Sequence, residues 1–258
     1  MVALLIGATI AKAQVPDPRV ADLVHVGKIR VGLFVPQYIK DPATGELKGV
    51  WSEIAQALAA RIGLQVVLLE HQTPAKALEC LEAGACDLLF LPFDARAANV
   101  GDFSPPIFQF DYTLLVPADS SVRSVVDADR HGVRIAAVCN HASTLTLSRL
   151  LKQAELVYAE TPDSTFDLLR TGRADAMASA RPTLLSFSTQ LPGSQVLEDR
   201  YGANINRMVV SKGKAGWLDY VSEFVEEAKA SGLVQKAIDR AGPRGTQVAP
   251  PGNPTTQQ

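Results

Sequence analysis

The sequence predicts an α/β fold built from two consecutive units in which strands and helices alternate. Short apolar runs typical of buried strands alternate with stretches whose apolar residues recur every three or four positions, as they do on one face of a helix. The alternation starts again after Pro117. The 258 residues are 47% hydrophobic and 20% charged, which is typical of a globular chain with a substantial core.

The first unit begins at residues 29–35 (IRVGLFV), an apolar run that predicts a buried strand. A turn rich in Pro, Asp and Gly follows at 41–49. Residues 50–62 (VWSEIAQALAARI) then place three apolar side chains four positions apart, which predicts a helix with Gly63 as its C-cap. The remaining elements expected here are strands at 64–69, 87–91 and 112–116 and a helix at 74–83.

The second unit repeats this order of elements without repeating the sequence. Its expected elements are strands at 133–138, 156–159 and 174–178 and helices at 143–152 and 164–171. The chain then supplies a strand at 208–211 and helices at 217–231 and 233–240. The first of these two helices is amphipathic with an acidic polar face, so it should pack on a core and not on a membrane. Residues 244–258 form a tail that is expected to be disordered because it has little apolar surface to bury.

Charge and residue spacing exclude several functions. The 25 Lys and Arg against 27 Asp and Glu give a net charge of −2, without the basic excess of a nucleic-acid-binding protein. The four histidines, His25, His71, His131 and His141, have no metal-ligand spacing. No dinucleotide fingerprint, phosphate-binding loop or nucleophile pattern stands out. We therefore expect no nucleic-acid partner, metal or cofactor.

The three cysteines, Cys80, Cys86 and Cys139, cannot all pair with one another. Cys80 and Cys86 flank a turn at Gly84 and could form a disulfide. The alternative, which we expect, is that both are small buried side chains.

The amino terminus predicts export. Residues 1–13 (MVALLIGATIAKA) are apolar and end in Ala-Lys-Ala, which fits a signal-peptidase site before Gln14, although the usual positive charge at the start is missing. The stretch is too short to span a bilayer. The alternative is a merely apolar amino terminus.

Several strings, in their order and spacing over residues 28–242, resemble the type II periplasmic solute-binding proteins of ABC transporters, family 3, the polar amino-acid-binding group. The matching strings are IRVG at 29–32, WSEIA at 51–55, GACDLLFL at 84–91, DARA at 94–97, DFSPP at 102–106, GRADA at 172–176 and ASGLVQKAI at 230–238.

This resemblance implies the two-lobed type II periplasmic-binding-protein fold, in which each lobe is a mixed β-sheet flanked by helices and the chain crosses between the lobes twice. Lobe 1 would comprise residues 24–116 and 209–243, and lobe 2 residues 117–208. The hinges would lie near Val116-Pro117 and Arg207-Met208. The protein would be a periplasmic monomer that binds a small carboxylate-bearing ligand between its lobes and delivers it to an ABC transporter permease.

Arg96 is the first candidate ligand-binding residue, because the family's arginine at this point binds the ligand carboxylate. A guanidinium can hold a carboxylate through two parallel hydrogen bonds. The alternative is a surface ion pair with Asp94 or Asp102.

Three further candidates, Asn140, His141 and Ser143, lie between a predicted strand and helix, where backbone N–H groups can bind an anion. Plain capping of the helix by Ser143 is the alternative.

Aromatic residues Phe34, Tyr38 and Trp51 fall where the family places side chains over the ligand. Core packing is the alternative, above all for Phe34.

Two departures from the family bear on which ligand binds. Leu91-Pro92-Phe93 stands where hydroxyl residues usually precede the arginine. Ala180 stands where the family usually has an Asp for the ligand ammonium, and Arg181 follows it. The ligand is expected to be an amino acid or a related organic acid. An acid without an amine, or a diacid held by Arg96 and Arg181, fits these two departures.

We expect a binding protein and not an enzyme. The alternative is a cyclohexadienyl-dehydratase-type enzyme on the same fold, which would need a general acid. Glu53 is the only carboxylate that we nominate for that role.

Overall fold

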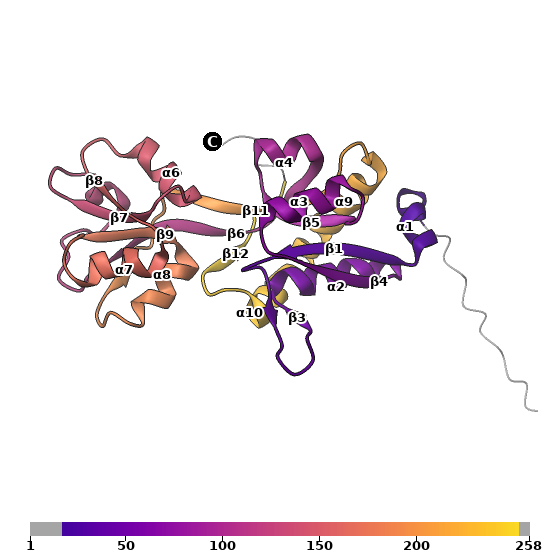
Figure 1. The fold of residues 1–258 in the computed structure, drawn as a ribbon, viewed down its shortest axis with the longest axis horizontal. Helices are drawn as coiled ribbons and strands as arrows, with labels where there is room; N and C mark the ends of the chain where they lie inside the picture. The colour runs from indigo at the N-terminus through magenta and orange to yellow at the C-terminus, as the bar shows by residue number, and fades with distance from the viewer. Residues whose placement is uncertain (1–16, 253–258) are drawn as a thin grey trace, which may run out of the picture.

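The computed structural model describes residues 17–252, which form two lobes lying end to end and joined by two long strands (Figure 1). The predicted signal segment at residues 1–13 lies outside the described residues. One mixed sheet runs through both lobes in the order β4-β1-β5-β11-β6-β9-β7-β8. Helices cover it, as the alternating pattern of the sequence predicted.

Lobe 1 is built on three parallel strands, β1 (Lys28–Phe34), β4 (Gln65–His71) and β5 (Leu88–Pro92). A small hairpin of β2 (Ile39–Lys40) and β3 (Leu47–Lys48) projects from it. Its helical elements are η1 (Pro18–Val20), α1 (Ala21–Val26), α2 (Val50–Ile62), α3 (Pro74–Glu82), α4 (Ala95–Val100), α9 (Ala215–Ala230) and α10 (Leu233–Ala241).

Helix α2 shows how the apolar spacing of the sequence becomes structure. Ile54 and Leu58 are fully buried in the core of lobe 1, one turn apart on the inner face of the helix. Gly63 ends the helix with a φ of 80°, a left-handed conformation that glycine adopts without steric cost. The helix predicted at residues 50–62, with this C-cap, is confirmed.

Lobe 2 repeats the arrangement around the parallel strands β7 (Arg134–Val138), β8 (Glu155–Ala159) and β9 (Ala176–Ala180). Its helices are α5 (Val125–Ala128), α6 (Ala142–Leu150), α7 (Pro162–Arg170) and α8 (Arg181–Ser188), and a short strand β10 (Gln195–Val196) lies at the edge. Its core is separate from that of lobe 1.

Strands β6 (Gly101–Val116) and β11 (Gly202–Ser211) pair antiparallel and cross between the lobes. Phe108 packs in the core of lobe 1, whereas Leu114 and Val116 pack in the core of lobe 2. The first boundary predicted at Val116-Pro117 is therefore wrong, because the end of β6 pairs with β9 inside lobe 2. The crossing lies within residues 109–113, and β6 is far longer than the strand predicted at 112–116.

The segment after α10 contradicts the predicted disordered tail over its first part. Strand β12 (Thr246–Val248) pairs antiparallel with residues 108–110 of β6. Gln247 donates a side-chain hydrogen bond to Asp111, 3.2 Å away, and Val248 packs against the core of lobe 1. Backbone pairing with the crossing strand thus orders a segment whose composition alone predicted disorder. Residues 253–258 lie outside the described part.

Cys80 and Cys86 form a disulfide, with their Cα atoms 5.3 Å apart. The expectation of two unpaired buried cysteines was wrong, because the turn after α3 brings the two side chains together. The bridge ties the last turn of α3 to the segment that enters β5. Cys139 is a free, exposed cysteine.

Candidate ligand-binding site

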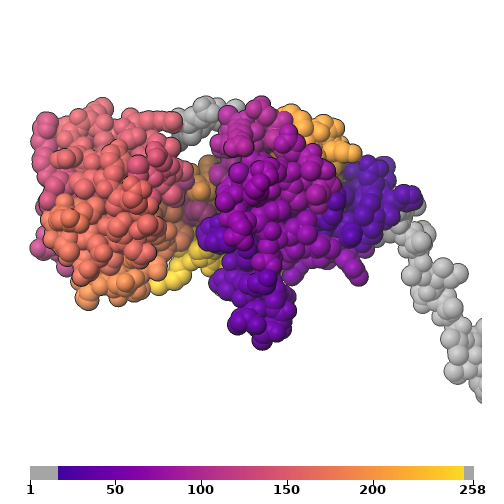
Figure 2. Space-filling model, in the orientation of Figure 1, coloured from indigo at the N-terminus to yellow at the C-terminus, as the bar shows by residue number. Residues whose placement is uncertain are grey.

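A cleft of about 760 Å³ lies between the lobes, over the crossing strands (Figure 2). Lobe 1 contributes Phe34, Gln37, Trp51, Thr73, Leu78, Leu91, Asp94 and Arg96, among others. Lobe 2 and the crossing strands contribute Phe110, Tyr112, His141, Ala180, Thr183, Asn204 and Asn206. The lining combines apolar and aromatic walls with a few polar groups, as ligand pockets usually do.

Four of the eight predicted site residues, Phe34, Trp51, Arg96 and His141, line this cleft. Tyr38 instead packs against the core of lobe 1 beside Glu70, and burial raises its pKa. The structure therefore brings together residues that lie as far as 107 positions apart in the chain. The other three predicted residues, Asn140, Ser143 and Arg181, do not line it.

Arg96 extends from the first turn of α4 with an exposed side chain. The expected competitor for its guanidinium, Asp94, is engaged elsewhere: Asp94 Oδ1 accepts the backbone N–H groups of Arg96 and Ala97, at 2.9 and 3.0 Å. Within residues 17–252, no hydrogen bond or ion pair holds the Arg96 guanidinium. A charged, unpaired donor group thus faces the cleft.

His141 and Ser143 form a second polar element, at the start of α6. His141 Nδ1 accepts the backbone N–H of Ser143 at 3.3 Å, and the Ser143 hydroxyl lies 2.7 Å from the same nitrogen. Because a backbone N–H can only donate, Nδ1 is an acceptor and the ring hydrogen resides on Nε2. Burial also lowers the pKa of His141, which favours this neutral ring.

Ser143 itself is 1% exposed and does not line the cleft, so it positions the imidazole and does not contact a ligand from where it lies. Here the histidine caps α6, and the capping by Ser143 that the sequence suggested does not occur. Asn140 precedes it with a φ of 57°, a left-handed conformation that asparagine tolerates, and is exposed outside the cleft.

Arg181 does not line the cleft, so the predicted second carboxylate-binding arginine is not in place. Its side chain is 11% exposed and lies 3.5 Å from Asp111 of β6. It also donates to the carbonyl oxygens of Leu197 and Glu198, both at 2.9 Å. This residue is therefore part of the framework of lobe 2. Ala180 does line the cleft, at the position where the family usually has an aspartate and this chain has no charge.

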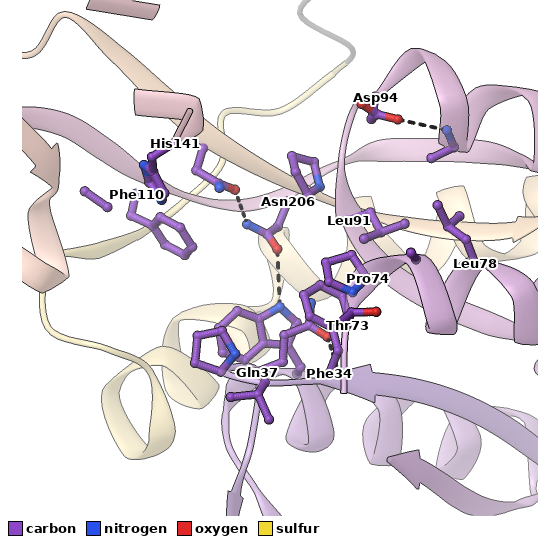
Figure 3. Close-up of a pocket in the computed structure, with 18 of the residues that line it drawn as sticks. Phe34, Gln37, Thr73, Pro74, Leu78, Leu91, Asp94, Phe110, His141 and Asn206 are labelled. Carbon is purple, nitrogen blue, oxygen red and sulfur yellow. Dashed lines mark hydrogen bonds between the residues drawn. The ribbon is translucent and has the colours of Figure 1, made fainter. Parts of the chain in front are cut away.

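Two asparagines of β11 were missed from the sequence. Trp51 Nε1 donates to Asn206 Oδ1 at 3.3 Å, and Asn206 Nδ2 donates to Asn204 Oδ1 at 2.8 Å (Figure 3). Asn206 is only 3% exposed, so these bonds fix its amide at the floor of the cleft. The alternation Asn204-Ile205-Asn206 was the available signal, but we placed the strand only from residue 208.

The acidic groups of the cleft are few. Asp94 is the only carboxylate among the lining residues of this cleft, against Arg96 and the neutral His141. Glu53, nominated as a general acid, lies in a different hollow and pairs with Arg240 at 2.7 Å. The formal charges of Asp94 and Arg96 balance, but Asp94 already accepts two backbone hydrogen bonds, whereas the Arg96 guanidinium is left to bind an anion.

Two α/β lobes, a pair of crossing strands and a cleft between them define a two-lobed ligand-binding protein. The chain belongs to the bacterial extracellular solute-binding proteins, family 3, whose model matches residues 30–242.

Similar proteins agree with this membership. A glutamine-binding protein of Geobacillus stearothermophilus is 24% identical over 63% of this chain and 63% of its own length, slightly less than two thirds. The ABC transporter glutamine-binding protein GlnH of Bacillus subtilis is 23% identical over 75% of this chain and 72% of its own.

Among solved structures, the ancestral amino acid-binding protein AncCDT-1, a precursor of cyclohexadienyl dehydratase, has a TM-score of 0.63 and 22% identity, covering 85% of this chain and 97% of its own. This likeness supports the two-lobed fold. Within residues 17–252 no helix has both the length and the apolar character needed to cross a bilayer.

Proposed function

We propose that this protein captures a small carboxylate-bearing ligand, an amino acid or related organic acid, in the cleft between its lobes. It does so in the periplasm and delivers the ligand to the permease of an ABC importer. The observation that carries the proposal is the unpaired Arg96 guanidinium in the wall of an otherwise largely apolar cleft. A carboxylate would receive two parallel charge-assisted hydrogen bonds from it.

The neutral His141 would provide a second donor from the opposite lobe, through the hydrogen on Nε2. Phe34, Leu91 and Phe110 would cover the apolar part of the ligand. Contacts from both lobes would favour the closed arrangement when ligand is present, because only that arrangement lets both reach the same molecule.

Within this class, we favour an acid without an α-ammonium group. The single lining carboxylate, Asp94, already accepts two backbone N–H groups and is exposed. Ala180 offers no charge on the side of lobe 2. An ammonium that left water for this cleft would lose hydrogen bonds without gaining a buried partner.

Binding without turnover is the part of the proposal that separates it from the dehydratase alternative. One structural neighbour, AncCDT-1, is a precursor of cyclohexadienyl dehydratase. In this chain, however, the nominated acid Glu53 is paired with Arg240 outside the cleft. Incubation with prephenate or arogenate, followed by mass spectrometry, tests this part: appearance of product would overturn binding-only function.

The test of ligand class is calorimetric titration with matched pairs of acids that differ only in the amine, such as glutarate with glutamate and succinate with aspartate. We expect the amine-free member of a pair to bind more tightly. Tighter binding of the amino acid throughout would refute this preference.

Arg96→Ala should then weaken binding about 30-fold or more, since truncating one partner of a desolvated charge pair costs about 2–5 kcal/mol. Arg173→Ala is the matched control, because Arg173 is an exposed arginine outside the cleft. Equal affinity of the two variants would refute the role of Arg96.

Uptake of the identified ligand by cells with and without the gene tests delivery to an importer.

A further inference from the structure

A histidine and two cysteines that are far from any metal-ligand spacing in the sequence meet at one point of lobe 1. His71 ends β4, Cys80 lies in α3, and Cys86 precedes β5. One potential ligand atom from each of the three lies within 4.8 Å of the others. The group is separate from the ligand cleft, since none of the three lines it.

The separation between the histidine nitrogen and one of the two sulfurs suits a shared metal ion. Cys86 Sγ and His71 Nε2 lie 3.7 Å apart. Tetrahedral zinc has Zn–S distances of about 2.3 Å and Zn–N distances of about 2.0–2.1 Å, which places sulfur and nitrogen about 3.5 Å apart. The histidine and one cysteine therefore already have the separation of two ligands of one zinc ion.

Gly32 of β1 lies close beside this group. A Cβ atom at position 32 would lie 2.6 Å from Leu89 Cδ2, 3.1 Å from Cys86 Sγ and 3.3 Å from His71 Cδ2. A larger residue at this position would therefore crowd two of the three proposed ligands. His71 and Cys80 are half-buried and Cys86 is buried, so an ion could enter from the side of the first two and keep water as its fourth ligand.

We propose that the disulfide-reduced form of this protein binds one Zn²⁺ through His71, Cys80 and Cys86. In the oxidised form the two sulfurs are bonded to each other and provide no thiolate. A dithiol reductant transfers two electrons and two protons to the bridge and becomes a disulfide itself. Zn²⁺ then displaces the two thiol protons, and two thiolates and the imidazole bind it.

The bound ion would replace the covalent tie between α3 and the start of β5. The disulfide holds these two segments together in the oxidised protein. Zinc would hold the same segments, and β4 in addition, after reduction. The site is thus switched by redox state: closed to metal when oxidised and open to metal when reduced.

The experiment uses the full chain with Cys139→Ser, so that the only thiols come from the bridge. A phosphine reductant opens the disulfide; it takes up the oxygen of one water while the disulfide takes up two hydrogen atoms. After removal of the phosphine under argon, Zn²⁺ is titrated with a competing chromophoric chelator, and Co²⁺ serves as a spectroscopic probe. We expect one equivalent of Zn²⁺ in the reduced protein, a thiolate-to-cobalt charge-transfer band, and neither in the oxidised protein.

Loss of a residue that only hydrogen-bonds to a metal ligand weakens metal binding roughly 10- to 100-fold. His71→Ala should weaken zinc binding by more than this, because it removes a direct ligand. His131→Ala, at an exposed histidine of lobe 2, should leave it unchanged. The Cys80→Ser, Cys86→Ser double variant should bind no zinc while keeping its circular dichroism spectrum.

Folding is followed in the same samples. Zinc should raise the melting temperature of the reduced protein, because an ion that binds only the folded state stabilises it. Absence of stoichiometric binding, equal binding by His71→Ala, or a reduced protein that stays unfolded when zinc is added would each overturn the proposal.

Discussion

Ala180→Asp tests how the cleft selects against an ammonium group. Ala180 ends β9 and lines the cleft, and it is the N-cap of α8 without a side-chain cap hydrogen bond. Pro182 has no N–H, so a carboxylate at position 180 would cap the N–H of Thr183. Its second oxygen would be available to an ammonium in the cleft.

The substitution should have two effects of different origin. Capping contributes about 1 kcal/mol, which raises the melting temperature by about 2–4 °C in a chain of this size. A charge-assisted hydrogen bond to the ammonium contributes about 1.5–3 kcal/mol, or about 10- to 150-fold in affinity. The second effect should appear only for ligands that carry the amine.

Ala180→Asn is the matched control, because asparagine caps a helix about as well as aspartate but carries no charge. Calorimetric titration of both variants with glutamate and glutarate gives the ratio of the two dissociation constants. We expect only Ala180→Asp to shift that ratio toward glutamate. The same ratio in both variants would show that position 180 does not face the ligand amine.

Two further predictions concern stability. Leu114→Ala, in the core of lobe 2, should lower the free energy of unfolding by about 2–5 kcal/mol in chemical denaturation. Leu145→Ala, at a side chain that is 47% exposed, should lower it far less. Similar losses in the two variants would contradict the assigned core. Hydrogen bonds from the backbone N–H groups of residues 152–154 lower the pKa of Asp129 below its ordinary 3.8. The stability that this carboxylate provides is therefore present above about pH 4 and is lost as the pH falls through its lowered pKa in the folded state. Asp129→Asn should flatten the acid limb of a profile of melting temperature against pH. An unchanged acid limb would contradict the assignment.

The sequence by itself determined most of the longer helices and strands and the order in which they occur. Periodic apolar residues and turn residues encode these features locally, as the helix at residues 50–62 and its Gly63 cap illustrate. The resemblance of short strings added the two-lobed arrangement and singled out Arg96, which does line the cleft. The same local information also identified Ala180 as a position without charge.

Tertiary structure alone decided which side chains meet. Arg181 was expected in the cleft, yet the pairing of β6 with β9 brings Asp111 close to it and holds it in the framework. The Cys80–Cys86 disulfide depends likewise on how the chain turns between α3 and β5.

The ends of elements show the same dependence on distant partners. Strand β12 is ordered because it pairs with β6, although its composition predicted disorder. Asn204 and Asn206 reach the cleft floor because β11 crosses between the lobes. Contacts between residues far apart in the chain leave no periodic trace in the local sequence, and this is the physical reason why the structure was needed to find them.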